Sequence, residues 1–112
     1  MIYSTSARAR GQVEEAQGRP LRALLTIAGR RLPLPPRGAT IGRSRDCDIV
    51  LDDTGISRRH AEIRPSDEGW TVADLGSTNG LMLNGRGIRG VHPLQAGDRV
   101  ELGSTEIVFE LG

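Results

Sequence analysis

Glycine and proline residues at short intervals are the feature that most constrains the fold of this chain. Its 112 residues include 15 glycines and six prolines, and most of them divide the chain from Leu21 onward into many short segments. None of these segments has the apolar period of an amphipathic helix, whereas residues 60–64 and 69–75 alternate like half-buried strands. The sequence therefore predicts an all-β domain, a two-sheet β-sandwich of roughly ten to eleven short strands.

The same pattern predicts approximate strand positions. Pro33 has no backbone N–H to donate, so its strand should lie at a sheet edge. Asn84-Gly85 is a strong hairpin signal, followed by a short return that includes Ile88 and Val91. Residues 48–51 have a continuous apolar centre, which is typical of a buried sandwich strand. The other expected strands are residues 22–27, 31–34, 39–42, 60–64, 69–75, 80–83, 98–102 and 105–111.

Residues 1–20 differ from the rest of the chain in composition. They are mostly small, polar or charged, and residues 13–17 could form at most a single helical turn. Such a short helix is marginal in water. We therefore expect residues 1–20 to be a flexible N-terminal tail or linker and residues 21–112 to form the folded domain.

Charge, cysteine content and hydropathy limit the class of protein. A formal net charge of +1 provides no large uniform field for a nucleic acid backbone. Cys47 is the only cysteine, which excludes an internal disulfide and fits a semi-buried thiol better than a redox site. No apolar run reaches the roughly 18 residues of a membrane-spanning helix, and a signal-peptide core is lacking. We expect a soluble cytoplasmic protein with no nucleic acid partner and no membrane insertion.

Three short blocks place polar side chains where predicted strands give way to loops. They are Thr40-Ile41-Gly42-Arg43-Ser44, Ile56-Ser57-Arg58-Arg59-His60 and Asp74-Leu75-Gly76-Ser77-Thr78-Asn79-Gly80. A rigid sheet could bring these loops together at one end. Guanidinium groups match a phosphate dianion bidentately, and a carboxamide can both donate to and accept from one peptide unit. This combination favours binding of a phosphorylated, extended peptide over transformation of a substrate.

Parts of these blocks together resemble the forkhead-associated (FHA) domain, namely Gly42-Arg43, Ser57-Arg58-Arg59-His60 and Ser77-Thr78-Asn79-Gly80. The resemblance runs from about Leu21 to Leu111 and is strongest to the C-terminal FHA domain of actinobacterial FHA regulatory proteins. It implies a two-sheet β-sandwich whose loops bind phosphothreonine at one end, with phosphoserine strongly disfavoured. The implied partners are Ser/Thr kinases or their substrates, including cell-envelope proteins.

The resemblance also implies a role for each polar residue of the site. Arg43 and Ser57 bind phosphate oxygens, and Arg58 adds a second positive group. Thr78 contacts the phosphate or shapes the pocket around the threonine methyl group. One methyl group in a snug apolar niche favours binding by roughly 1 kcal/mol. Asn79 holds the main chain of the bound peptide.

Five neighbouring residues complete the predicted site. Ser44 and Arg45 share the loop of Arg43 and could touch residues that flank the phosphothreonine. Gly42 lets the backbone approach a ligand, and Gly80 allows the tight turn into the next strand. His60 is implied by the resemblance to brace the loops by hydrogen bonds.

A hydrolase is one alternative, because Ser57, His60 and an aspartate could form a catalytic triad. However, no Gly-x-Ser-x-Gly elbow surrounds Ser57. A metal site is equally weakly supported, since His60, His92 and Cys47 lack ligand spacing. We interpret the acidic loop residues as solvated: Asp46, Asp48, Asp52 and Asp53.

The other alternative is a domain that keeps the fold without the ligand, as a phosphate-independent interaction or oligomerisation unit. Such a structural domain has no need of Arg43, Ser57 and Asn79 together. The sequence therefore favours a phosphothreonine-binding module, without catalysis, metal or cofactor.

Overall fold

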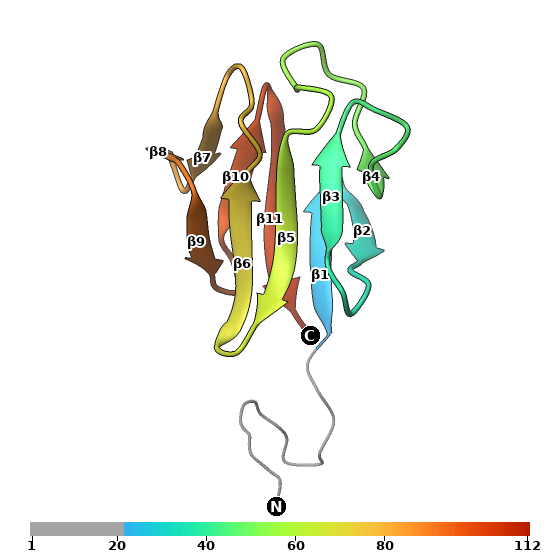
Figure 1. Ribbon diagram of the computed structural model, residues 1–112. Helices are drawn as coiled ribbons and strands as arrows, with labels where there is room; N and C mark the ends of the chain where they lie inside the picture. Colours follow the sequence, from blue (N-terminus) through green and yellow to red (C-terminus); the bar gives the residue numbers. More distant parts are fainter. Residues whose placement is uncertain (1–21) are drawn as a thin grey trace, which may run out of the picture.

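The protein forms a β-sandwich of eleven strands (Figure 1). The structure is a computed structural model, and it describes residues 22–112. The predicted tail at residues 1–20, with its possible helical turn, lies outside the described residues. The strands are β1 (Ala23–Ile27), β2 (Arg30–Pro33), β3 (Ala39–Gly42), β4 (Ile49–Val50), β5 (Ala61–Ser66), β6 (Gly69–Asp74), β7 (Leu81–Leu83), β8 (Arg86–Ile88), β9 (Val91–Leu94), β10 (Arg99–Leu102) and β11 (Thr105–Leu111).

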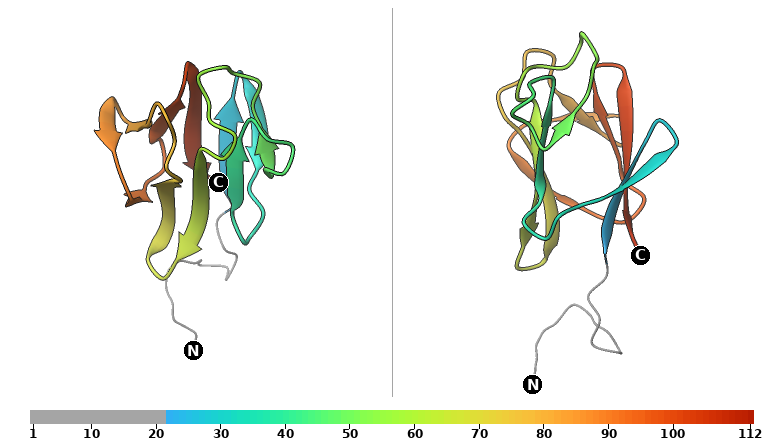
Figure 2. Two further views of the ribbon diagram at one scale, coloured as in Figure 1. Left: turned by 45° about the horizontal axis from the view of Figure 1, so that its top comes forward. Right: turned by 90° about the vertical axis from the view of Figure 1, so that its right-hand side faces the viewer.

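Two sheets face each other, as the side view in Figure 2 shows. The six-stranded sheet has the order β2-β1-β11-β10-β7-β8, and the five-stranded sheet has the order β4-β3-β5-β6-β9. Residues 22–112 contain no helix. The predicted all-β, two-sheet sandwich is therefore confirmed.

The core lies between the sheets and follows from strand alternation. On β1, Ala23, Leu25 and Ile27 are buried, and the residues between them are partly exposed. Phe109 of β11 is paired with Leu25 and fully buried, and its ring centroid lies 6.3 Å from that of Trp70. Trp70 belongs to the opposite sheet, so this contact joins the two layers. Full burial of each large apolar side chain stabilises the fold by about 1.5–3 kcal/mol.

Two local predictions are confirmed at the sheet edges. Asn84 and Gly85 have φ angles of 52° and 85° and connect β7 to β8, as expected for a hairpin turn with both central residues left-handed. The strand that contains Pro33 is β2, which lies at the edge of the six-stranded sheet.

Two other local predictions are wrong. Residues 48–51 do not form a buried strand: β4 has only two residues, lies at a sheet edge and leaves Val50 49% exposed. Ile88 and Val91 do not share one return strand. Ile88 ends β8 in the six-stranded sheet, and Val91 begins β9 in the five-stranded sheet. In both cases the apolar pattern did not show which sheet a short segment joins. Nor did it show whether the segment lies at the centre or at the edge of that sheet.

Strand directions bring the three polar blocks together. β3 and β6 both pair antiparallel with β5, so their C-terminal ends lie beside the N-terminal end of β5. The loops at residues 43–48, 51–60 and 75–80 therefore gather at one end of the sandwich, at the top of Figure 1. We call this group of three loops the loop end.

Candidate functional site

The three segments of the loop end are joined by backbone hydrogen bonds. The N–H of Arg43 donates to the carbonyl of Ser57 at 3.1 Å, and the N–H of Ser44 donates to the carbonyl of Arg58 at 3.0 Å. The N–H of Leu75 donates to the carbonyl of His60 at 2.9 Å. The middle loop thus binds both of its neighbours, which fixes the relative positions of the side chains that the loops carry.

Arg43 is exposed and held through one of its nitrogen atoms. Its Nε donates to the carbonyl of Ile56 at 2.8 Å. Within residues 22–112 no carboxylate forms an ion pair with this guanidinium. Gly42 is buried beneath it, and a Cβ at this position would overlap the carbonyl oxygen of Arg58. Only glycine permits the close approach of these two loops.

Ser57 and Asn79 link the middle loop to residues 75–80. The N–H of Thr78 donates to Ser57 Oγ at 3.0 Å, and Asn79 Nδ2 donates to the carbonyl of Gly55 at 2.9 Å. Thr78 and Asn79 are exposed, and Ser57 is half-buried. The predicted phosphate-binding and main-chain-binding residues therefore lie on adjoining loops.

His60 is fully buried directly beneath these contacts. The N–H of Ser57 donates to His60 Nδ1 at 3.0 Å, so the ring proton lies on Nε2, which bonds the carbonyl of Gly80 at 2.6 Å. Gly80 has a φ of 82°, the left-handed conformation that glycine adopts readily. Both ring nitrogens bind backbone groups, so His60 lacks the bond to the Ser57 hydroxyl that a catalytic pair requires.

The rim of the site carries further polar side chains. Ser44 Oγ accepts from the N–H of Asp46 at 3.1 Å, while Arg45 and Arg58 are exposed and form no ion pair within residues 22–112. Cys47 is buried, and its thiol donates to the carbonyl of Arg58 at 3.2 Å. The structure thus brings together the predicted contact residues: Arg43, Ser44, Arg45, Ser57, Arg58, Thr78 and Asn79. Their roles toward a ligand stay predictions.

The family model described as FHA domain matches residues 39–103, which is more than half of the chain and includes the whole loop end. The chain belongs to the FHA family. An oxoglutarate dehydrogenase inhibitor from Corynebacterium efficiens is 42% identical to this FHA domain over 85 residues, which are 76% of this chain and 59% of that protein. The chain thus spans less than two thirds of the length of this curated relative.

Solved structures agree with the family assignment. One, from a structural and functional analysis of phosphothreonine-dependent FHA domain interactions, has a TM-score of 0.75 and 36% identity, covering 81% of this chain and 97% of its own. EmbR from Mycobacterium tuberculosis, in complex with a low-affinity phosphopeptide, has a TM-score of 0.82 and 34% identity. That match covers 88% of this chain and 26% of the EmbR chain.

Sequence reasoning missed two structural carboxylates in this FHA domain. The interpretation as a solvated loop residue is wrong for Asp53, which is half-buried and binds several donors. Asp48 is exposed as expected but also binds several donors. Asp48 Oδ2 accepts from the N–H of Thr40 at 3.0 Å and from its hydroxyl at 3.2 Å. Mainly that backbone bond holds the pKa of Asp48 below its usual value. Thr40 lies eight residues before Asp48, and no local pattern in the sequence indicates this bond.

Asp53 makes the wider set of contacts. Its Oδ1 accepts from the N–H of Gly55 at 2.8 Å. Its Oδ2 accepts from Ser104 N at 2.9 Å, Ser104 Oγ at 3.1 Å and Thr105 Oγ1 at 2.7 Å. The Thr105 hydroxyl, followed by the N–H groups of Gly55 and Ser104, lowers the pKa of Asp53 from 3.8 to about 2. The spacing Asp53-Thr54-Gly55 could have predicted the local bond to Gly55, as in an Asx turn.

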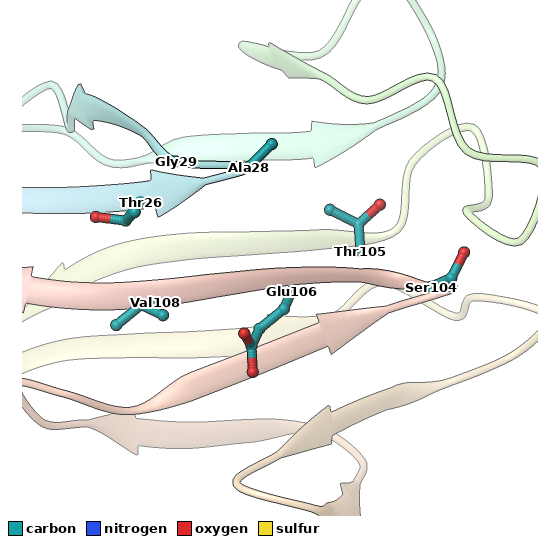
Figure 3. A pocket seen from close by; sticks show the side chains of 7 residues that line it. All are labelled: Thr26, Ala28, Gly29, Ser104, Thr105, Glu106 and Val108. Atoms are coloured by element: carbon teal, nitrogen blue, oxygen red, sulfur yellow. The ribbon is translucent and has the colours of Figure 1, made fainter.

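A shallow hollow lies beside the β1–β2 and β10–β11 turns (Figure 3). None of the predicted site residues lines it. Its lining residues are Thr26, Ala28, Gly29, Ser104, Thr105, Glu106 and Val108. The candidate site lies elsewhere, at the loop end.

The described part of the chain offers no cluster of three metal-ligating side chains. It also has no helix with the length and apolar character needed to span a membrane.

Proposed function

We propose that this FHA domain is a phosphothreonine-dependent interaction module, which recruits proteins phosphorylated by Ser/Thr kinases and catalyses no reaction itself. One observation carries the proposal. Arg43, Ser57 and Asn79, whose functional groups suit a phosphate and a peptide main chain, lie on adjoining loops that hydrogen bonds hold together.

The phosphate would bind between Arg43 and Ser57. The bond from Arg43 Nε to Ile56 orients the guanidinium and leaves its two terminal nitrogens for phosphate oxygens. Ser57 Oγ already accepts a bond from Thr78, so its own proton is available to donate to the phosphate. Arg58 would add a second positive charge, and Thr78 would line the pocket.

Asn79 would bind the peptide itself. Its Nδ2 donates one N–H to the carbonyl of Gly55, and this bond fixes the plane of the carboxamide. The other N–H and the Oδ1 acceptor remain for the carbonyl and N–H of the ligand main chain. Ser44 and Arg45 would touch flanking residues, while Gly42, His60 and Gly80 would support the loops.

The proposed partners are phosphothreonine-containing proteins, namely Ser/Thr kinases or their substrates. The relative from Corynebacterium efficiens is an oxoglutarate dehydrogenase inhibitor, and this regulatory role supports the proposal that the whole protein is a bacterial signalling or cell-envelope regulator. The proposed location is the cytoplasm, where the thiol of Cys47 would stay reduced. The module requires no cofactor, nucleic acid or membrane insertion.

Calorimetric titration with three matched peptides tests the proposal. They carry phosphothreonine, unmodified threonine or phosphoserine at one position of an otherwise identical sequence, taken from a degenerate phosphothreonine library screen. We expect binding of the phosphothreonine peptide, no measurable binding of the unmodified peptide, and much weaker binding of the phosphoserine peptide. Equal binding of phosphorylated and unmodified peptides would instead favour a phosphate-independent interaction domain.

A further inference from the structure

Asp53 connects the loop end to the opposite sheet. It lies on the loop between β4 and β5, whereas Ser104 and Thr105 lie at the β10–β11 turn of the six-stranded sheet (Figure 3). One carboxylate oxygen binds Gly55 in its own loop, and the other binds three donors across the sandwich. Within residues 22–112 no arginine forms an ion pair with Asp53. The carboxylate therefore acts here through hydrogen bonds from uncharged donors.

The residues that Asp53 fixes carry the proposed binding groups. The N–H of Gly55 donates to Asp53, and the carbonyl of Gly55 accepts from Asn79 Nδ2 at 2.9 Å. The N–H of Ile56 donates to the carbonyl of Asp53 at 2.9 Å, and the carbonyl of Ile56 accepts from Arg43 Nε at 2.8 Å. A single peptide segment thus connects Asp53 to the two side chains proposed to bind the peptide and the phosphate.

Close backbone packing gives this connection little freedom. A Cβ added to Gly55 would lie 3.0 Å from Gly103 Cα, and one added to Gly103 would lie 2.9 Å from the Gly55 carbonyl carbon. Both distances are shorter than ordinary van der Waals contact. The β4–β5 loop therefore rests directly on the β10–β11 turn, and Asp53 fastens the two together.

We infer that Asp53 is a positioning residue of the phosphopeptide site, which holds the Gly55–Ile56 peptide so that Asn79 and Arg43 point toward the ligand. This inference rests on the proposed function. The substitution Asp53→Asn keeps the size of the side chain but replaces one acceptor oxygen with an amide donor. In either orientation that amide faces a backbone N–H, that of Gly55 or that of Ser104, so at least one of these two bonds is lost.

The first experiment titrates a phosphothreonine peptide against the wild type, Asp53→Asn and Asp52→Asn, at a temperature far below unfolding. Asp52 is the exposed neighbour and makes none of these contacts, so it is the matched control. We expect Asp53→Asn to weaken binding by about fivefold or more and Asp52→Asn to change it by less than about twofold. Unchanged or tighter binding by Asp53→Asn, with only a lower melting temperature, would overturn the inference.

A double-mutant cycle separates positioning from general loosening of the fold. If Asp53 acts through the Gly55–Asn79 contact, the effects of Asp53→Asn and Asn79→Ala should overlap. The fold-loss of affinity in the double variant should then be smaller than the product of the fold-losses in the two single variants. Multiplicative losses would contradict action through Asn79. Should Asp53→Asn not fold, Thr105→Val is the alternative. It removes the 2.7 Å bond from Thr105 Oγ1 to Asp53 and leaves the sequence of the β4–β5 loop intact. Thr105→Val should weaken binding as well, and unchanged affinity would overturn the inference.

The side-chain amide signal of Asn79 in the peptide-free domain gives an independent readout by NMR. Asp53→Asn should shift this signal and Asp52→Asn should not, and the absence of a shift would contradict the positioning role. Failure of the wild type to bind any phosphothreonine peptide would instead refute the proposed function. The two failures are therefore distinguishable.

Discussion

Replacing His60 with alanine should lower the stability and the peptide affinity of the domain together. The imidazole is fully buried, and its two nitrogens bind the Ser57 N–H at 3.0 Å and the Gly80 carbonyl at 2.6 Å. Alanine would leave both backbone groups without that partner. Each buried polar group left unsatisfied costs about 1–3 kcal/mol, so the free energy of unfolding should fall by about 2–6 kcal/mol.

This loss is large beside the roughly 5–15 kcal/mol that stabilises a typical domain. A loss of 1 kcal/mol lowers the melting temperature of a domain this small by about 4–8 °C, so we expect a decrease of at least about 8 °C. Water that enters the vacated polar site would keep the loss near the lower limit. Peptide binding should weaken because Ser57 and Gly80 belong to the two loops that His60 joins.

Thermal unfolding followed by circular dichroism measures the first effect, and titration with a phosphothreonine peptide at low temperature measures the second. His92→Ala is the control, because His92 is half-buried and its side chain forms no hydrogen bond within residues 22–112. An unchanged melting temperature with lost binding would show that His60 contacts the ligand and does not brace the loops. Wild-type values for both would refute the reasoning altogether.

Three further predictions concern neighbouring residues. Arg43→Ala should weaken phosphopeptide binding by about 30-fold or more, with thermal unfolding almost unchanged because the side chain is exposed; a calorimetric affinity within about threefold of wild type would contradict this. Gly42→Ala should lower the melting temperature, because its Cβ would overlap the Arg58 carbonyl; wild-type thermal unfolding would show that the loops separate freely. Folding lowers the pKa of Asp53 from 3.8 to about 2, so its stabilising effect is present above pH 3.8 and is lost as the pH falls through 2. The stability difference between wild type and Asp53→Asn should therefore shrink over this range in urea titrations, and a constant difference would contradict the assignment.

The sandwich, the hairpin at Asn84-Gly85 and the edge position of Pro33 could be predicted because each depends on local chemistry. Alternation marks the buried face of a strand, and paired left-handed residues suit a two-residue turn. Proline lacks a donor wherever it lies. The apolar run at residues 48–51 misled because apolar content does not distinguish a central strand from a two-residue edge strand.

The site could be predicted only in part, because some of its contacts depend on long-range packing and not on local sequence. The residue types in the three blocks indicated phosphate and peptide chemistry, and the antiparallel order of β3, β5 and β6 brings those blocks together. Asp53 was misinterpreted because its main partners, Ser104 and Thr105, lie about fifty residues away in the other sheet. Long-range hydrogen bonds of this kind depend on how the sheets stack, which no local pattern encodes.

The central claim is that the loop end recognises a phosphorylated peptide and not merely an anion. Asn79→Ala tests it most directly, because this change keeps the side chains of Arg43, Ser57 and Arg58. Besides the bond of Asn79 to Gly55, it removes up to two hydrogen bonds to the ligand main chain. Each is worth about 0.5–1.5 kcal/mol, so affinity for a phosphothreonine peptide should fall by roughly tenfold or more. Weak binding of free inorganic phosphate, measured by NMR titration, and the salt dependence of peptide binding should both be unchanged. Equal losses for peptide and free phosphate would contradict main-chain recognition by Asn79.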